Sequence, residues 1–159
     1  MDQIKEQILQ RVKSTYKSLQ TPDFGFVKEA QNARPYEGLL RNLRHHCVIE
    51  EVTPEEEDVC FSYMVQRHDR LWKLDLSMVS KYGLFVRLSA NVGKKDFLTL
   101  TKSDLTDFER RIVETISSKG ILLLPAQLLE QPVELTLFNT DKANTSLYQA
   151  LFTDKPRPW

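Results

Sequence analysis

The chain has 159 residues, with 22 basic and 22 acidic side chains and therefore a formal net charge of zero at pH 7. Hydrophobic residues make up 41% and charged residues 28%, which is typical of one folded domain with a real core and excludes disordered and collagen-like chains. The neutral balance argues against a protein that coats nucleic acid or docks on an anionic membrane, because both functions need a surplus of positive charge.

The charge of the first residues and the small number of cysteines indicate the cellular compartment. The chain begins with charges at Asp2 and Lys5 and lacks the apolar stretch of a secretory signal. Its longest apolar run, Ile121–Leu124, is far shorter than the roughly 18 residues that span a bilayer. Two cysteines, Cys47 and Cys60, are too few for a disulfide framework. The sequence predicts a cytoplasmic protein with free thiols that does not enter a membrane.

The first 46 residues carry helical patterns. Apolar residues recur every four positions at Ile4, Ile8, Val12 and Tyr16. This spacing predicts an amphipathic helix that stops before Pro22, because proline disfavours helix at the residue before it. A loop is expected from there to about Arg34. Pro35 is suited to the first position of a second helix, which is predicted to end near His46.

From Cys47 the apolar period changes from about 3.6 to 2, which predicts strands over residues 47–101. Two half-buried strands flank the polar run Arg67–Arg70, whose length and composition are typical of a hairpin loop. An acidic turn, Glu55–Asp58, is expected to be solvated. The predicted strands cover residues 48–53, 59–66, 72–78, 84–88 and 97–101.

The last third of the chain mixes short elements. A strong amphipathic helix is predicted over residues 103–119, with Ser103 as its cap and Gly120 after its end. The part from 121 to 152 is expected to hold a buried strand at 121–124, a short helix after Pro125, a further alternating strand at 133–137 and a final helix near 147–151. The prolines keep residues 153–159 extended.

This order of elements is typical of the α+β class. We expect a single domain over residues 1–159, in which helices pack on one face of a largely antiparallel sheet of about four to six strands. The order of the strands does not follow from the sequence.

Histidines and cysteines near one another suggest a zinc site. His45, His46 and Cys47 are adjacent, Cys60 lies in a predicted strand and His68 lies in the predicted hairpin loop. Zinc sites usually contain pairs of ligands about two to four positions apart, and these histidines and cysteines do not form such pairs. A role in stabilising the last carbonyl groups of the predicted helix explains His45 and His46 with fewer assumptions than a zinc site. We therefore predict neither a metal nor another cofactor, and His46, Cys60 and His68 stay as candidates for a polar site.

Asp75 is the best candidate among the carboxylates for acid–base chemistry, because it lies mid-strand between Lys73 and Ser77 on the polar face. A surface pair with a basic neighbour is the alternative interpretation. Cys60 is either a nucleophile or a small core residue. Phosphate-binding loops and the usual hydrolase motifs are absent, so an enzyme is less strongly indicated than a binding protein.

Aromatic residues outside the periodic faces favour a protein partner. Phe24 and Phe26 lie in the predicted loop, and Trp159 follows two prolines, although each could instead pack on the chain's own core. The main hypothesis is a small protein-interaction domain, such as an adaptor, assembly chaperone, inhibitor or immunity-type protein, that binds another protein or itself as a homodimer. The alternative is a small hydrolase or ligand-binding domain with a polar site at one end of the sheet.

Overall fold

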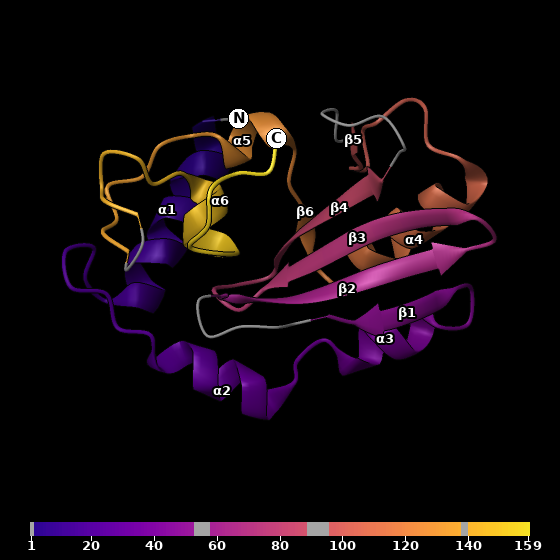
Figure 1. The fold of residues 1–159 in the computed structure, drawn as a ribbon, viewed down its shortest axis with the longest axis horizontal. Helices are drawn as coiled ribbons and strands as arrows, with labels where there is room; N and C mark the ends of the chain where they lie inside the picture. Colours follow the sequence, from indigo (N-terminus) through magenta and orange to yellow (C-terminus); the bar gives the residue numbers. More distant parts are fainter. Residues whose placement is uncertain (1, 53–57, 89–95, 138–139) are drawn as a thin grey trace.

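A computed structural model gives the fold and describes residues 2–52, 58–88, 96–137 and 140–159 (Figure 1). The helices in these ranges are α1 (Asp2–Tyr16), α2 (Gly25–Ala33), α3 (Glu37–Leu43), α4 (Asp107–Ser118), α5 (Ala126–Leu129) and α6 (Leu147–Leu151). The strands are β1 (Val48–Glu51), β2 (Cys60–Arg67), β3 (Arg70–Ser77), β4 (Tyr82–Leu88), β5 (Asp96–Phe97) and β6 (Leu122–Leu123). None of the described helices is long and apolar enough to cross a membrane.

One open sheet holds all the described strands, in the order β1-β2-β3-β4-β5. These neighbours are antiparallel, and β6 adds a short parallel pair beside the start of β4. The predicted hairpin is present, with His68 and Asp69 as the turn between β2 and β3. The α+β class and the largely antiparallel sheet expected from the sequence are therefore confirmed.

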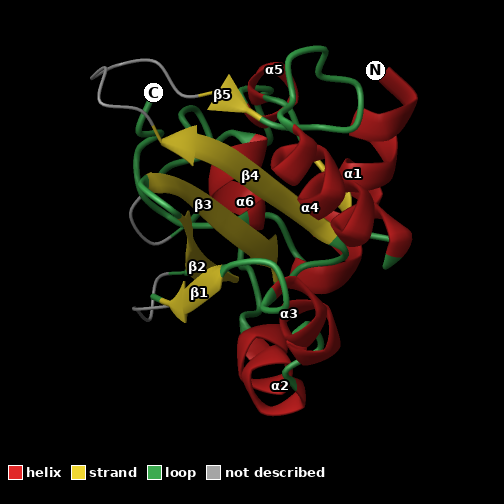
Figure 2. Cartoon of the chain, turned by 90° about the vertical axis from the view of Figure 1, so that its right-hand side faces the viewer, coloured by secondary structure: helices red, strands yellow, loops and turns green. Residues whose placement is uncertain are grey.

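Helices cover the two faces of this sheet differently. Helices α3 and α4 pack on the face that receives Phe61, Leu74 and Phe85 from β2, β3 and β4. Helices α1, α5 and α6 gather at one end of the sheet and form a second core with Leu84 and Val86, the β4 residues on the opposite face (Figure 1). Figure 2 shows α4 and the end of the chain on opposite sides of the strands. None of the described helices covers the rest of the second face.

The predicted loop before Arg34 is wrong, because most of it forms α2. The Asp23 side chain accepts a hydrogen bond from the Gly25 amide at 2.8 Å, which turns the chain into the helix. Phe26 and Val27 then pack between the two cores, and Arg34 ends the helix in the left-handed conformation, at a φ of 48°. Burial against distant residues, which no local period reveals, stabilises this short helix.

Three other local predictions need correction. The strand expected over residues 97–101 is reduced to β5, which ends at Phe97. Helix α4 begins at Asp107 and not at Ser103, because Thr106 and Glu109 form a capping box. The alternating segment 133–137 forms no strand in the structure: Val133, Leu135 and Leu137 are buried, but their backbone joins no ladder of the sheet. Alternation there reflects contact with the second core rather than strand pairing.

Glu109 links α4 to the sheet. Its carboxylate, 0% exposed, accepts hydrogen bonds from Trp72 Nε1 at 2.8 Å, from the Arg87 guanidinium at 2.6 and 2.7 Å and from the Thr106 amide at 2.9 Å. Burial by itself raises the pKa of Glu109, but the hydrogen bonds from Arg87, Thr106 and Trp72 outweigh it and lower the pKa to about 2. The ionised carboxylate is thus fixed in the protein by three partners from different elements.

Replacing Glu109 by glutamine removes this charge but keeps the shape of the side chain. We expect Glu109→Gln to lower the free energy of unfolding by about 1.5–3 kcal/mol at neutral pH, because charged hydrogen bonds are lost. In the wild type this stabilisation is complete above the ordinary pKa of 4.5 and is lost as the pH falls through about 2. Urea denaturation across the pH range measures both effects. Glu114→Gln, on the exposed face of the same helix, is the control, and equal losses in the two variants would contradict the prediction.

Candidate functional site

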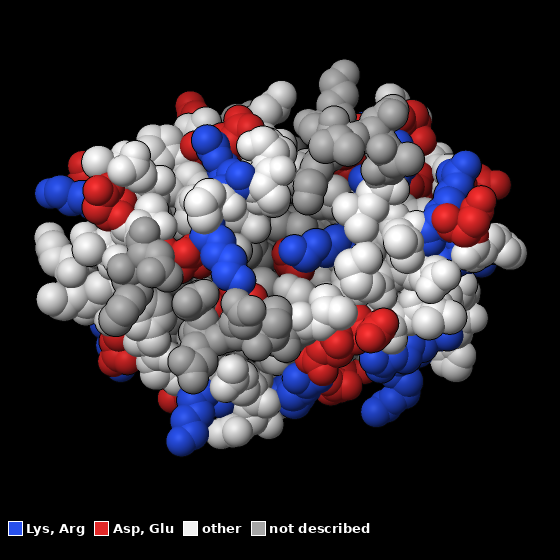
Figure 3. Space-filling view, viewed as in Figure 1, with Lys and Arg blue, Asp and Glu red and all other residues white. Residues whose placement is uncertain are grey.

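The open face of the sheet carries a row of polar side chains because of the β2–β3 register. Ser62 and Asp75 are directly opposite each other, and Cys60 and Lys73 lie two positions away along their strands on the same face. Figure 3, which views this side of the molecule, shows basic and acidic side chains next to each other around a hollow near its centre. The alternation that buries the hydrophobic residues on the α4 face thus collects these polar groups on the other.

These side chains line a pocket of about 280 Å³. The strands form its floor, the Tyr148 side chain from α6 forms one wall, and Pro156 and Pro158 from the last residues of the chain border it. Two carboxylates and two lysines contribute to the lining, namely Asp58, Asp75, Lys73 and Lys155.

Asp75 is the most unusual group in the pocket. It is 2% exposed, and its Oδ2 lies 3.6 Å from the Lys73 ammonium while the Ser62 hydroxyl also bonds to the carboxylate. Its Oδ1 accepts no hydrogen bond, and it is the one buried side-chain polar atom among the described residues of which this is true. Burial raises the pKa of Asp75 and outweighs the effects of Lys73 and Ser62. A buried carboxylate oxygen without a partner is costly for the fold.

Cys60 lies on the same floor of the pocket, as a buried thiol with a raised pKa. Its thiol is 2% exposed and lies 3.6 Å from the Ser62 hydroxyl. Burial, with the nearby Asp75 carboxylate, raises the pKa of Cys60 well above its usual value. The thiol is therefore neutral at physiological pH, and of the two sequence interpretations the structure favours the small buried residue over the nucleophile.

Asp58, Tyr148 and Thr153 belong to the site although the sequence did not point to them. Asp58 was expected in a solvated acidic turn, but it is 7% exposed and accepts a hydrogen bond from the Thr153 hydroxyl. The other acidic residues of that turn, Glu55–Glu57, lie outside the described residues. Lys73 and Ser62 could have been found from strand alternation and the hairpin alone. The contacts from α6 and from residues 153–158 join distant parts of the chain, so no local sequence pattern predicts them.

Trp159 packs back on its own domain. Its ring makes edge-to-face contacts with Phe97 and Tyr148, at centroid distances of 4.9 and 5.0 Å, and its Nε1 donates to Glu130 at 2.8 Å. The last residues are therefore drawn across the rim of the Asp75 pocket. Whether Trp159 also contacts a partner stays a prediction.

The remaining candidates lie elsewhere. His46 is exposed just beyond α3, and His68 is exposed in the β2–β3 turn with a φ of 56°; neither lines the Asp75 pocket. Across the described ranges, no three His, Cys, Asp or Glu side chains gather as a metal site would require. Phe24 and Phe26 both pack on Tyr16, at centroid distances of 5.5 and 5.1 Å, and Phe24 keeps 40% of its surface exposed.

No protein-family model matches the chain, and no curated protein and no solved structure is significantly similar to it. The chemistry of the pocket is consequently the basis for assigning a function. Its groups can accept and donate hydrogen bonds in a partly enclosed space, where burial raises the pKa of the Cys60 thiol.

The raised pKa of Asp75 gives a test of how this pocket affects the fold. A carboxyl whose folded pKa exceeds the unfolded value of 3.8 binds more protons in the native state, so its contribution to stability falls as the pH rises above 3.8. We expect Asp75→Asn to be more stable than the wild type at neutral pH, by about 1 kcal/mol, with a difference that grows with pH. Thermal unfolding over the pH range measures it, with Asp69→Asn in the exposed turn as the control. A variant that is less stable at every pH would contradict the expectation.

The packing of Trp159 predicts a second effect on stability. Each of its two aromatic contacts is worth about 0.5–1.5 kcal/mol, so Trp159→Ala should lower the free energy of unfolding by about 1–3 kcal/mol. Deletion of Pro156–Trp159 should cost at least as much, as measured by denaturation. Unchanged melting temperatures would show that the ring contributes nothing to the isolated domain and would favour its use as an anchor for a partner.

Proposed function

We propose that this protein is a binding domain for a small polar molecule that presents a hydrogen-bond donor, a hydroxyl or an ammonium group, to Asp75. The observation that carries the proposal is that Asp75 lines the pocket while its buried Oδ1 accepts no hydrogen bond. Leaving such an atom unpaired costs about 1–3 kcal/mol. A ligand that donates to Oδ1 recovers this free energy on binding, which favours the bound state.

The pocket also indicates the size and charge of the ligand. Its volume of about 280 Å³ is just below the lower end of the usual range for small-molecule sites, about 300–1,000 Å³. The two carboxylates and two ammonium groups of the lining sum to a formal charge of zero, which favours a ligand without a large net charge. Tyr148, Pro156 and Pro158 supply an apolar wall against which a short carbon skeleton packs.

Binding is better supported than hydrolysis. None of the described residues that line the pocket is a histidine, so neither Ser62 nor Cys60 has an imidazole base beside it. The raised pKa of the Cys60 thiol argues in the same direction. Asp75 remains available as an acceptor that orients a ligand.

The two tryptophans of the chain make a direct experiment available. Trp159 and Asp75 line a small crevice next to the pocket, whereas Trp72 is buried on the α4 face, so their indole N–H resonances report on the site and on a distant reference. Isotope-labelled protein is titrated with ethanolamine, glycerol and acetamide, which donate hydrogen bonds, and with acetate, which only accepts them. We expect at least one donor to shift the Trp159 resonance selectively, and acetate to leave it in place.

Asp75→Asn should weaken this shift, most of all for the cationic ethanolamine, because the amide oxygen still accepts a hydrogen bond but carries no charge. Asp69→Asn should preserve it. The proposal is wrong if no donor shifts the Trp159 resonance, or if the shift persists unchanged in Asp75→Asn.

A second candidate function, docking of a partner protein, is favoured by a groove on another part of the surface. This groove of about 470 Å³ runs between β6, α5 and the residues after β5, and its described lining contains no charged residue. Ile4, Leu100 and Leu122 border it and are 37%, 51% and 41% exposed. An uncharged, apolar segment of a partner in extended conformation suits this lining, because β6 pairs with β4 on one side only in the described sheet.

Leu122→Asp and Leu71→Asp form a matched pair for this test, because both leucines are 41% exposed and only Leu122 borders the groove. We expect a stoichiometric partner from the source lysate to be retained by Leu71→Asp and lost by Leu122→Asp. Equal retention by the two variants would remove the groove from consideration. Self-association that only Leu122→Asp abolishes, measured by light scattering, would replace the foreign partner with a second copy of the chain.

A further inference from the structure

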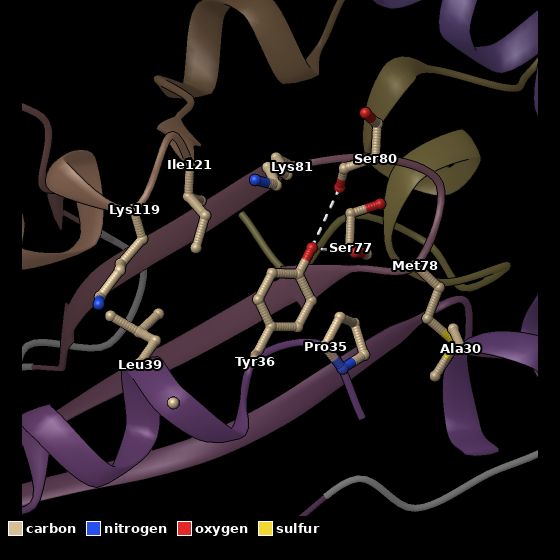
Figure 4. Close-up of a pocket in the computed structure, with 11 residues that line it drawn as sticks. Ala30, Pro35, Tyr36, Leu39, Ser77, Met78, Ser80, Lys81, Lys119 and Ile121 are labelled. Carbon is tan, nitrogen blue, oxygen red and sulfur yellow. Dashed lines mark hydrogen bonds between the residues drawn. The ribbon is translucent and has the colours of Figure 1, made fainter. Parts of the chain in front are cut away.

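A second cavity lies on the opposite side of the sheet from Asp75. It has a volume of about 410 Å³ and is framed by the end of α2, the start of α3, the β3–β4 turn and the segment after α4 (Figure 4). Tyr36, Leu39, Met78 and Ile121 give it a mainly apolar lining. These four residues belong to the core beneath α3 and α4 and not to the core around α6.

Two lysines from different elements border this cavity. Lys81 comes from the β3–β4 turn and Lys119 directly follows α4, and Figure 4 shows them on the same side of the cavity, flanking Ile121. Neither makes an ion pair with another described residue, and no acidic residue belongs to the described lining. The carbonyl end of α4 offers about half a negative charge. Against two ammonium groups, a surplus of about one and a half positive charges remains at the rim.

Gly38 provides an independent observation. It lies in the first turn of α3 and lines the cavity, and a Cβ added there would meet nothing within 4 Å. Neither a positive φ nor a close contact calls for glycine at this position. Within a helix, glycine costs about 0.5–1 kcal/mol relative to alanine. The structure therefore gives up helix stability at a place where the missing side chain keeps the cavity open.

Tyr36 makes the apolar wall rigid. Its hydroxyl donates to the carbonyl oxygens of Ser77 at 2.6 Å and Ser80 at 3.2 Å, so the ring is held at the centre of the cavity wall (Figure 4). Burial raises the pKa of Tyr36, and the neutral phenol brings no negative charge to the site. A fixed ring beside a cationic rim is prepared for a ligand with an apolar body and one negative end.

We propose that this cavity binds a small amphipathic anion, with a carboxylate at Lys81 and Lys119 and a hydrocarbon body against Tyr36, Leu39 and Ile121. The volume suits a single short chain rather than a two-chain lipid. This site is separate from the Asp75 pocket, and the inference does not rest on the function proposed for that pocket.

Octanoate and octanol, which share a chain and differ in charge, are the probes. We expect isothermal titration calorimetry of the full chain to detect octanoate and to show much weaker binding of octanol. Lys81→Gln and Lys119→Gln should each weaken octanoate binding by up to about fivefold, the effect of one exposed charge, and added salt should weaken binding in the wild type. Lys142→Gln, an exposed lysine elsewhere, should have no effect. Vesicles of anionic phospholipid should not bind; if they do, the ligand is a lipid headgroup and the free anion is wrong.

Gly38→Leu and Gly38→Ala locate the hydrocarbon body. The leucine fills the cavity and should abolish octanoate binding, whereas alanine should bind octanoate as the wild type does and should raise the melting temperature. Octanoate binding that is unchanged in Gly38→Leu, or in both lysine variants, would overturn the proposal. The lysine variants change only exposed side chains, so they test it even if Gly38→Leu does not fold. Asp75→Asn should bind octanoate normally, which separates this result from the fate of the Asp75 pocket.

Discussion

The register of the β2–β3 hairpin is the constraint on which the rest of the structure depends. A turn of two residues sets Ser62 opposite Asp75 and Phe61 opposite Leu76. Because side chains alternate along a strand, a slip by one residue would exchange the apolar and polar rows and place Asp75 under α4. One register thus builds both the hydrophobic core on the α4 face and the polar floor on the other, and Glu109 then fixes α4 to the sheet through Trp72 and Arg87.

Much of this fold could be predicted because local periods coincide with burial. Helix α1 and the hairpin follow from the apolar periods of their own segments, and the short strand β6 follows from the length of one apolar run. Helix α2 could not be predicted in that way, since its apolar side chains face two cores built from other parts of the chain. Segment 133–137 shows the converse error: its alternation is real, but burial without a neighbouring strand produces the same pattern.

The candidate site divides along the same line. Asp75 and Cys60 were accessible to sequence reasoning, because alternation and one hairpin place them on a common face. Asp58 was not, since its partner Thr153 lies 95 positions away, and the sequence around it is typical of a solvated turn. The cavity beside Gly38 could not be predicted either. A single glycine in a helical segment does not show from the sequence that open space lies next to it.

Ser77, at the end of β3, connects the two sides of the sheet. Its carbonyl oxygen accepts from Tyr36, which forms the wall of the lysine-rimmed cavity, and its hydroxyl donates to the Leu151 carbonyl of α6 at 2.7 Å. The same helix carries Tyr148 to the Asp75 pocket. The walls of both cavities therefore depend on one serine, which is itself 1% exposed, so that a substitution of Ser77 disturbs both sides of the sheet at once.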